Sequence, residues 1–170
     1  MIILESERLV LKTSTMENFQ NVFSLLSDPD VMRYVGNGPR TENEVRDGLE
    51  KMVKHQEKYG FAFGDIYHKN SGDYIGRAGL IHLAMNDEQD EIEVGYQLHQ
   101  KYWGNGYATE ITKALIKWGF EHLKLNQIVA VIQPENQSSK RVLEKSGLDY
   151  VGKIIYHGRE VLKFKIEKRV

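Results

Sequence analysis

Residues 91 to 122 combine a strand, a glycine-containing loop and a helix in one stretch, EIEVGYQLHQKYWGNGYATEITKALIKWGFEH. Polar and apolar residues alternate over 91–98, the period typical of a strand. Gly104 and Gly106 mark the loop, and apolar residues recur at helical spacing over 108–118. Because a glycine loop at a helix N-terminus offers unpaired backbone amides and the positive end of the helix dipole, the stretch predicts a site for an anion such as pyrophosphate.

The rest of the chain shows strand and helix patterns in a mixed order. Two potential capping boxes, Ser14 with Glu17 and Thr41 with Glu44, precede the first two helices. The order predicts an α/β fold with a mixed sheet, antiparallel early and with a helical crossover after the central strand. Strands are expected near 7–13, 61–68, 74–83, 91–98, 126–133, 149–156 and 160–168, and helices near 16–26, 41–59, 107–122 and 136–146.

Length and composition exclude several classes of protein. The 170 residues suit a single domain, and the formal net charge of -1 argues against a nucleic-acid or membrane-surface partner. The chain has no cysteine, which removes disulfides, thiolate metal sites and a cysteine nucleophile. The histidines form no metal-binding spacing. Neither a signal peptide nor an apolar run of roughly 20 residues is visible, so a cytoplasmic protein is expected.

The glycine loop does not fit the common nucleotide fingerprints. The dinucleotide pattern fails because Thr109 occupies the position of its third glycine. A Walker-like run at 147–153 is followed by Ile154 instead of the serine or threonine that the motif requires. The run also leads from a helix into a strand, which is the wrong direction for cradling a phosphate. Taken alone, the loop could also be only a tight turn in which glycine supplies unusual backbone angles.

Three separate motifs resemble those of the GCN5-related N-acetyltransferases (GNAT). HQKYWGNGYATE resembles the pyrophosphate signature R/Q-x-x-G-x-G/A, with Lys101 at the first position. Residues 93–96 (EVGY) resemble the strand before it, and residues 136–148 (NQSSKRVLEKSGL) resemble the downstream helix motif, with Leu148 in place of phenylalanine. ERLVL at 7–11 also fits. The likeness covers nearly the whole chain, and it is strongest to the branch of ribosomal-protein N-terminal alanine and serine acetyltransferases.

This resemblance implies a fold and a co-substrate. The GNAT fold is a mixed, mostly antiparallel sheet of about seven strands flanked by about four helices, with strands 4 and 5 splayed around acetyl-CoA. The fourth strand is expected to contact the pantetheine arm, and the glycine loop is expected to hold the pyrophosphate. The cofactor-binding residues implied are Leu98, His99, Gln100, Lys101, Trp103, Gly104, Asn105, Gly106, Tyr107, Ala108, Thr109, Asn136 and Ser139.

Acetyl transfer requires a neutral amine, whereas a free α-amino group has a pKa near 8 and an alkylamine a pKa near 10.4. A base must therefore remove a proton. Glu93 is the first candidate for this base and Glu91 the second, although both could be solvated strand carboxylates. Many relatives carry a tyrosine acid where this chain has Leu143. Ser139 is the candidate that replaces it, and it could instead only cap the helix.

The sequence thus predicts one N-acetyltransferase domain over residues 1–170 that moves an acetyl group directly from acetyl-CoA to a primary amine in a ternary complex. The expected acceptor is a protein N-terminal α-amine. Alternatives are a small-molecule amine, such as a polyamine, an amino acid or an antibiotic, and a non-catalytic acyl-CoA sensor, which the absence of the tyrosine acid suggests. The expected partners are acetyl-CoA and the amine, with no nucleic acid or membrane, in a monomer or homodimer.

Overall fold

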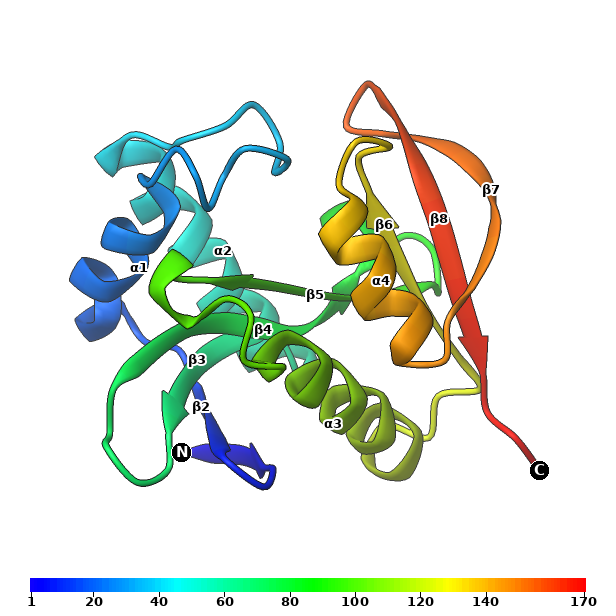
Figure 1. The fold of residues 1–170 in the computed structure, drawn as a ribbon, viewed down its shortest axis with the longest axis horizontal. Coiled ribbons are helices and arrows are strands. Elements are labelled where there is room, and N and C mark those ends of the chain that lie inside the picture. The colour runs from blue at the N-terminus through cyan, green and yellow to red at the C-terminus, as the bar shows by residue number, and fades with distance from the viewer.

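The computed structural model describes residues 1–170, and all strands join one sheet (Figure 1). The predicted α/β fold is confirmed, with eight strands instead of about seven. The strands are β1 (Ile2–Glu5), β2 (Leu9–Thr13), β3 (Phe63–His68), β4 (Tyr74–His82), β5 (Ile92–Leu98), β6 (Gln127–Ile132), β7 (Asp149–Tyr156) and β8 (Arg159–Glu167). Their order in the sheet is β1-β2-β3-β4-β5-β6-β8-β7. The additional strand is β1, whose four residues are too few to show a periodic pattern.

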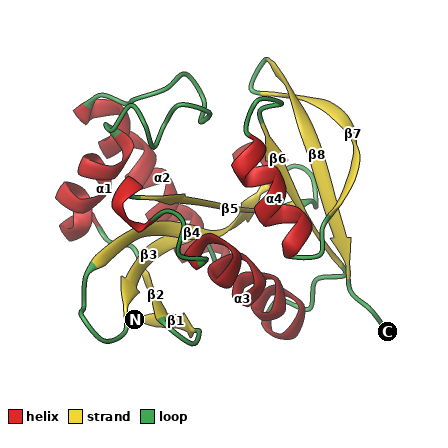
Figure 2. Cartoon of the chain, in the orientation of Figure 1, coloured by secondary structure: helices red, strands yellow, loops and turns green.

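Four α-helices cover the two faces of the sheet (Figure 2). Helices α1 (Phe19–Leu26) and α2 (Glu42–Tyr59) form one apolar cluster against Tyr74 of β4. Helices α3 (Tyr107–His122) and α4 (Gln137–Lys145) contribute to the larger core on the opposite face. None of the helices has the length and apolar character that crossing a bilayer requires.

The two predicted capping boxes have different outcomes. The Thr41 hydroxyl accepts a hydrogen bond from the Glu44 amide and the Glu44 carboxylate accepts one from the Thr41 amide, both at 3.2 Å, so this box forms as predicted. The box at Ser14 is wrong. Ser14 is buried directly after β2, its hydroxyl has no partner, and a 3-10 turn (Met16–Asn18) precedes α1.

The sheet divides where β5 and β6 meet. Strand β5 pairs with β4 in antiparallel register over its full length, from Ile92 to Leu98. With β6 it runs parallel and pairs at one position only, Glu93 with Val129. Beyond this position the two strands diverge, as Figure 1 shows. They correspond to the splayed fourth and fifth strands that the family resemblance implies, and their separation opens the sheet next to the N-terminus of α3.

Candidate active site

The glycine loop offers a row of free backbone amides at the start of α3. The amides of Tyr102 and Trp103 donate to the carbonyls of His99 and Gln100, both at 3.0 Å. Every amide from Gly104 to Thr109 lacks an acceptor within the protein, and the next amide, that of Glu110, donates to Gly106 O at 3.0 Å. Consecutive free amides at a helix N-terminus favour an anion. The geometry therefore suits the pyrophosphate that the sequence analysis assigned to this loop.

Two glycines give the loop its shape. Gly104 and Gly106 have φ of 76° and 79°, in the left-handed region, and Gly106 is the N-cap of α3. Asn105 between them donates from Nδ2 to the carbonyls of Tyr102 and Trp103, both at 3.1 Å. The Asn105 side chain thus closes the turn through two carbonyls and leaves the backbone amides of the loop unbonded.

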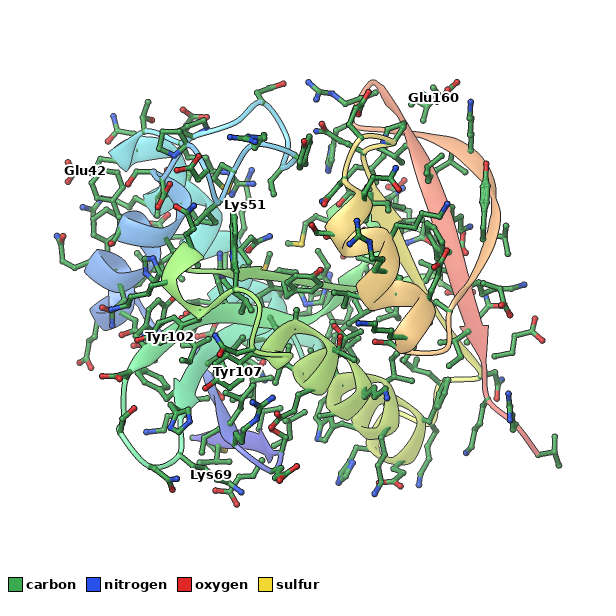
Figure 3. All side chains as sticks on the ribbon, in the orientation of Figure 1. Glu42, Lys51, Lys69, Tyr102, Tyr107 and Glu160 are labelled. Carbon is green, nitrogen blue, oxygen red and sulfur yellow. The ribbon has the colours of Figure 1, made fainter.

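Arg8, in the turn between β1 and β2, holds the loop from the other end of the chain. Its Nη1 donates to Asn105 O at 2.9 Å, and its guanidinium lies 4.4 Å from the ring centre of Tyr107. Its Nε also pairs with Glu110 at 2.7 Å. Burial opposes ionisation of Glu110, but hydrogen bonds from Ser6 and Arg8 outweigh it and hold the Glu110 pKa below its usual value. Figure 3 labels Tyr107 at the start of α3, next to Tyr102.

The end of β5 borders the gap toward β6. The His99 amide donates to Ile75 O of β4 at 3.0 Å. Because neighbouring residues of a strand point their amides in opposite directions, the Leu98 backbone points away from β4 and toward the gap. The Leu98 carbonyl there accepts the indole N–H of Trp103 at 2.9 Å. Gln100 and Lys101 belong to a 3-10 turn (Gln100–Tyr102) that leads from β5 into the loop.

Glu93 lies where β5 and β6 begin to part, and it is almost completely buried, with 6% of its surface exposed. Its Oε1 accepts the Tyr156 hydroxyl at 2.8 Å and its Oε2 accepts the Ala84 amide at 3.2 Å. Burial raises the pKa of Glu93 to about 7, and the two hydrogen bonds oppose this rise. A carboxylate with this pKa can accept a proton near neutral pH.

The segment that donates to Glu93 has an unusual backbone. Ala84 and Met85 have φ of 59° and 56°, in the left-handed region that non-glycine residues seldom adopt. Such conformations cost of order 1 kcal/mol or more and persist where the surrounding structure imposes them. Here the turn directs the Ala84 amide at the Glu93 carboxylate.

Glu91, the second candidate base, has a different environment. It lies just before β5, and Lys163 of β8 contacts both of its oxygens, at 2.9 Å and 2.7 Å. Both oxygens of Glu91 are therefore occupied by an ion pair, whereas burial raises the pKa of Glu93 toward neutrality. Of the two acids, Glu93 is the one whose surroundings favour proton uptake.

Ser139 and Tyr96 form a hydroxyl pair across the opening. The Ser139 hydroxyl on α4 and the Tyr96 hydroxyl on β5 are 2.9 Å apart, and either can donate. Asn136 caps α4, accepting the Ser139 amide at 3.2 Å. The cap that the sequence analysis considered for Asn136 is therefore formed. Leu143, at the tyrosine position of many relatives, is buried in the core with 3% of its surface exposed and offers no proton donor.

Sequence reasoning missed three of these residues. Arg8 was part of a quoted motif without a role, and Tyr96 was part of the EVGY run. Tyr156 carries no local signal, since its contact with Glu93 joins positions 63 residues apart. The position of Tyr96 on the strand that borders the gap could have indicated it, although its side chain points to the opposite face from that of Glu93. Tyr156, by contrast, requires the folded sheet.

If Ser139 and Tyr96 act as one proton-donating unit, their substitutions should not add. Ser139→Ala and Tyr96→Phe are each expected to lower kcat about tenfold, and the double variant no more than either alone. Steady-state rates at saturating acetyl-CoA, with calorimetric affinities for CoA as the control, measure this. Additive losses, or unchanged rates, would show that the pair is not a unit in the reaction.

Comparison with known proteins agrees with this geometry. The family model described as "Acetyltransferase (GNAT) domain" matches residues 8–149. The uncharacterized N-acetyltransferase YoaA of Bacillus subtilis is 32% identical, over 88% of this chain and 84% of YoaA. The crystal structure of an acetyltransferase from Agrobacterium tumefaciens superimposes with a TM-score of 0.86 at 27% identity, covering 97% of this chain and 94% of that one. RimL, a ribosomal L7/L12 alpha-N-protein acetyltransferase solved with coenzyme A, shares the fold with a TM-score of 0.81, 15% identity and 98% coverage of both chains.

The chain belongs to the GNAT family of acetyltransferases. It is an N-acetyltransferase, and its co-substrate is acetyl-CoA, as the resemblance of its three motifs to the family implied. The acceptor amine is a separate question, because the family shares the cofactor half of the site and differs in the acceptor half.

Proposed function

We propose that the protein transfers the acetyl group of acetyl-CoA to a peptide α-amine by direct attack, with Glu93 as the base. The observation that carries this proposal is the position and state of Glu93. Its buried carboxylate lies at the one paired position of the two diverging strands, with a pKa near 7. Residues 1–170 act as one acetyltransferase domain in this proposal, supported by the single sheet.

The lower pKa of an α-ammonium group makes it an easier proton donor to Glu93 than a side-chain ammonium. An α-ammonium group has a pKa near 8, about one unit above that of Glu93, whereas a lysine-like ammonium is more than about three units above it. Each unit costs ~1.4 kcal/mol in proton transfer. Proton transfer to Glu93 therefore yields the neutral α-amine about a hundredfold or more readily than the neutral lysine-like amine, without any contribution from contacts to the rest of the acceptor.

The steps balance with the residues described. Glu93 takes one proton from the ammonium group, directly or through water, and the amine nitrogen attacks the thioester carbonyl carbon. A carbon–nitrogen bond forms and the carbon–sulfur bond breaks. As this bond breaks, the nitrogen loses its second proton to solvent water. The departing thiolate takes a proton from the Ser139 hydroxyl, which regains one from Tyr96 through their 2.9 Å contact, and Tyr96 regains one from solvent water. Glu93 then releases its proton to solvent water, which returns every group to its starting state. The backbone amides of the glycine loop hold the pyrophosphate throughout.

The test is release of free CoA thiol from acetyl-CoA with a panel of amines. Because the chain has no cysteine, the protein adds no thiol background. Peptides with free N-termini are expected to react, and the same peptides with blocked N-termini are expected to be silent even when they contain lysine. Reaction with polyamines, free amino acids or aminoglycosides instead of peptides would assign a small-molecule acceptor. Tight CoA binding without turnover on any amine would favour the sensor and contradict the proposal.

A further inference from the structure

Helix α2 contacts both ends of the turn that follows β4. This turn (Leu83–Met85) comes directly after His82, the last residue of β4, and Asp87 lies two residues beyond it. Its middle residue, Ala84, is the one whose amide donates to Glu93 Oε2 at 3.2 Å. The C-terminal end of α2 bonds to His82 on one side of the turn and to Asp87 on the other. The backbone group that bonds the candidate base is therefore enclosed by two contacts to one helix.

A pair of histidines forms the first contact. His55 Nε2 and His82 Nδ1 are 2.9 Å apart, and the backbone amide of His82 lies 3.4 Å from the same Nε2. His55 Nδ1 lies 2.6 Å from the Phe61 carbonyl, which can only accept, so this nitrogen carries the ring proton and Nε2 is an acceptor. His82 therefore donates from Nδ1 to His55. Burial lowers the pKa of His55 and outweighs the hydrogen bond to Phe61, which favours this neutral form of the ring.

Asp87 forms the second contact. The Tyr59 hydroxyl donates to Asp87 Oδ2, and Lys58 Nζ pairs with the same oxygen at 3.1 Å. Lys58 and Asp87 also act on the pKa of His55, in opposite directions. The Tyr59 ring packs against the His82 ring with their centres 4.5 Å apart, which joins the two contacts. Because the Lys58–Asp87 ion pair is exposed and exposed pairs stabilise little, the histidine pair is the stronger of the two contacts.

The backbone of the turn depends on being held. The two residues with left-handed backbone angles lie inside it, and such angles persist where the surrounding structure imposes them. Two backbone hydrogen bonds accompany them, from the Leu83 amide to Glu91 O at 2.9 Å and from the Asn86 amide to Leu83 O at 3.1 Å. Freed at its His82 end, the turn can relax toward ordinary backbone angles. This movement withdraws the Ala84 amide from the candidate base.

From this arrangement we propose that His55 and His82 are positioning residues for the base, because their hydrogen bond holds the turn whose Ala84 amide bonds the Glu93 carboxylate. Neither histidine bonds Glu93 itself, so both act through the backbone of the turn. The inference rests on the proposed function, in which Glu93 is the base, and it deepens that function by assigning residues that set the state of this carboxylate.

The consequence is a change in the titration of Glu93. Two hydrogen bonds oppose the rise of its pKa, one from the Tyr156 hydroxyl and one from the Ala84 amide. Its register partners, Ile81 on β4 and Val129 on β6, carry no charge that could replace a lost donor. Loss of the Ala84 amide should therefore raise the midpoint of the titration by roughly half to one pH unit.

Two substitutions at His82 separate the hydrogen bond from the packing. His82→Phe keeps a ring beside Tyr59 and removes the donor, whereas His82→Asn loses the ring and keeps an amide donor near the position of Nδ1. The ¹³C NMR signal of the Glu93 carboxyl, assigned by its loss in Glu93→Gln, reports the midpoint directly. The midpoint should rise by about half to one unit in His82→Phe and stay at the wild-type value in His82→Asn. In His82→Phe, kcat/KM should fall about three- to tenfold at pH 6 and approach the wild-type value at pH 9.

His122→Phe is the matched control. It makes the same replacement at an exposed histidine whose ring stacks on Trp118, and it should change neither the midpoint nor kcat/KM. A midpoint that moves in neither His82 variant, equally in both, or only in His82→Asn would overturn the inference. Because the titration needs no turnover, this result is separate from the proposed function. A midpoint that moves as expected without a matching change in the pH dependence of kcat/KM would overturn Glu93 as the base and leave the positioning of its carboxylate.

Discussion

Replacing Glu93 with glutamine is expected to lower kcat by roughly 10²–10⁴-fold and to leave the affinity for acetyl-CoA unchanged. Glutamine has the shape of glutamate, and its amide oxygen can still accept the Tyr156 hydroxyl, but it cannot take a proton. Steady-state kinetics and calorimetry with CoA measure the two quantities. A Glu91→Gln variant decides between the two carboxylates, because a larger loss at Glu91 would transfer the role of the base to that residue.

The pH dependence of the same reaction gives a second measure of Glu93. The base must be ionised, so kcat/KM is expected to rise with pH through about 7, the pKa of the buried carboxylate. In Glu93→Gln this rise of kcat/KM with pH should disappear. A rise that persists unchanged in the variant would belong to another group, such as the amine itself.

Protein stability should change with pH in the opposite direction. The Glu93 pKa is near 7 in the folded state and near 4.5 in the unfolded state, so the folded protein binds the additional proton between these values. Stability is therefore lost as pH rises through this window, by an amount of order 3 kcal/mol for this group alone. Glutamine does not titrate, so Glu93→Gln lacks this loss. In urea titrations, the free energy of unfolding of the variant relative to that of wild type should therefore increase between pH 5 and pH 8.

The cofactor half of the site could be predicted from local sequence because it is built locally. The glycines at 104 and 106 determine the loop, and the helix that starts at Tyr107 supplies the free amides. The distant Arg8 then holds the loop that these local signals define. The same holds for the Thr41–Glu44 box and for the left-handed Gly60 at the end of α2. The second acid, Glu91, could not be separated from Glu93 by pattern, because its ion pair with Lys163 joins two different strands.

The acceptor half depends on contacts between remote segments. Tyr156 reaches Glu93 from the far end of β7. In the sequence this residue is an ordinary strand tyrosine. Only the register of the sheet brings it next to a buried carboxylate. The same separation explains why the family resemblance identified acetyl-CoA and left the amine open.

Gly106 provides the second large effect. Replacing Gly106 with valine is expected to weaken acetyl-CoA binding by about 10–100-fold, because φ of 79° is strongly unfavourable for a β-branched residue and the loop must rearrange. The free amides would then lose their common orientation toward the pyrophosphate, and each charge-assisted hydrogen bond lost costs ~1.5–3 kcal/mol. The new side chain would also come within 3.5 Å of Arg8 Nη2, which holds the loop. Calorimetry with CoA measures the affinity.

Gly158→Val separates this effect from simple destabilisation. Gly158 has φ of 77° in the turn between β7 and β8, and no atom lies within 4 Å of the position of its missing side chain. Both variants should therefore lose a similar ~1–2 kcal/mol of folding stability from backbone strain. Only Gly106→Val should lose affinity for CoA. Equal affinities in the two folded variants would mean that the amide row at the start of α3 does not hold the pyrophosphate.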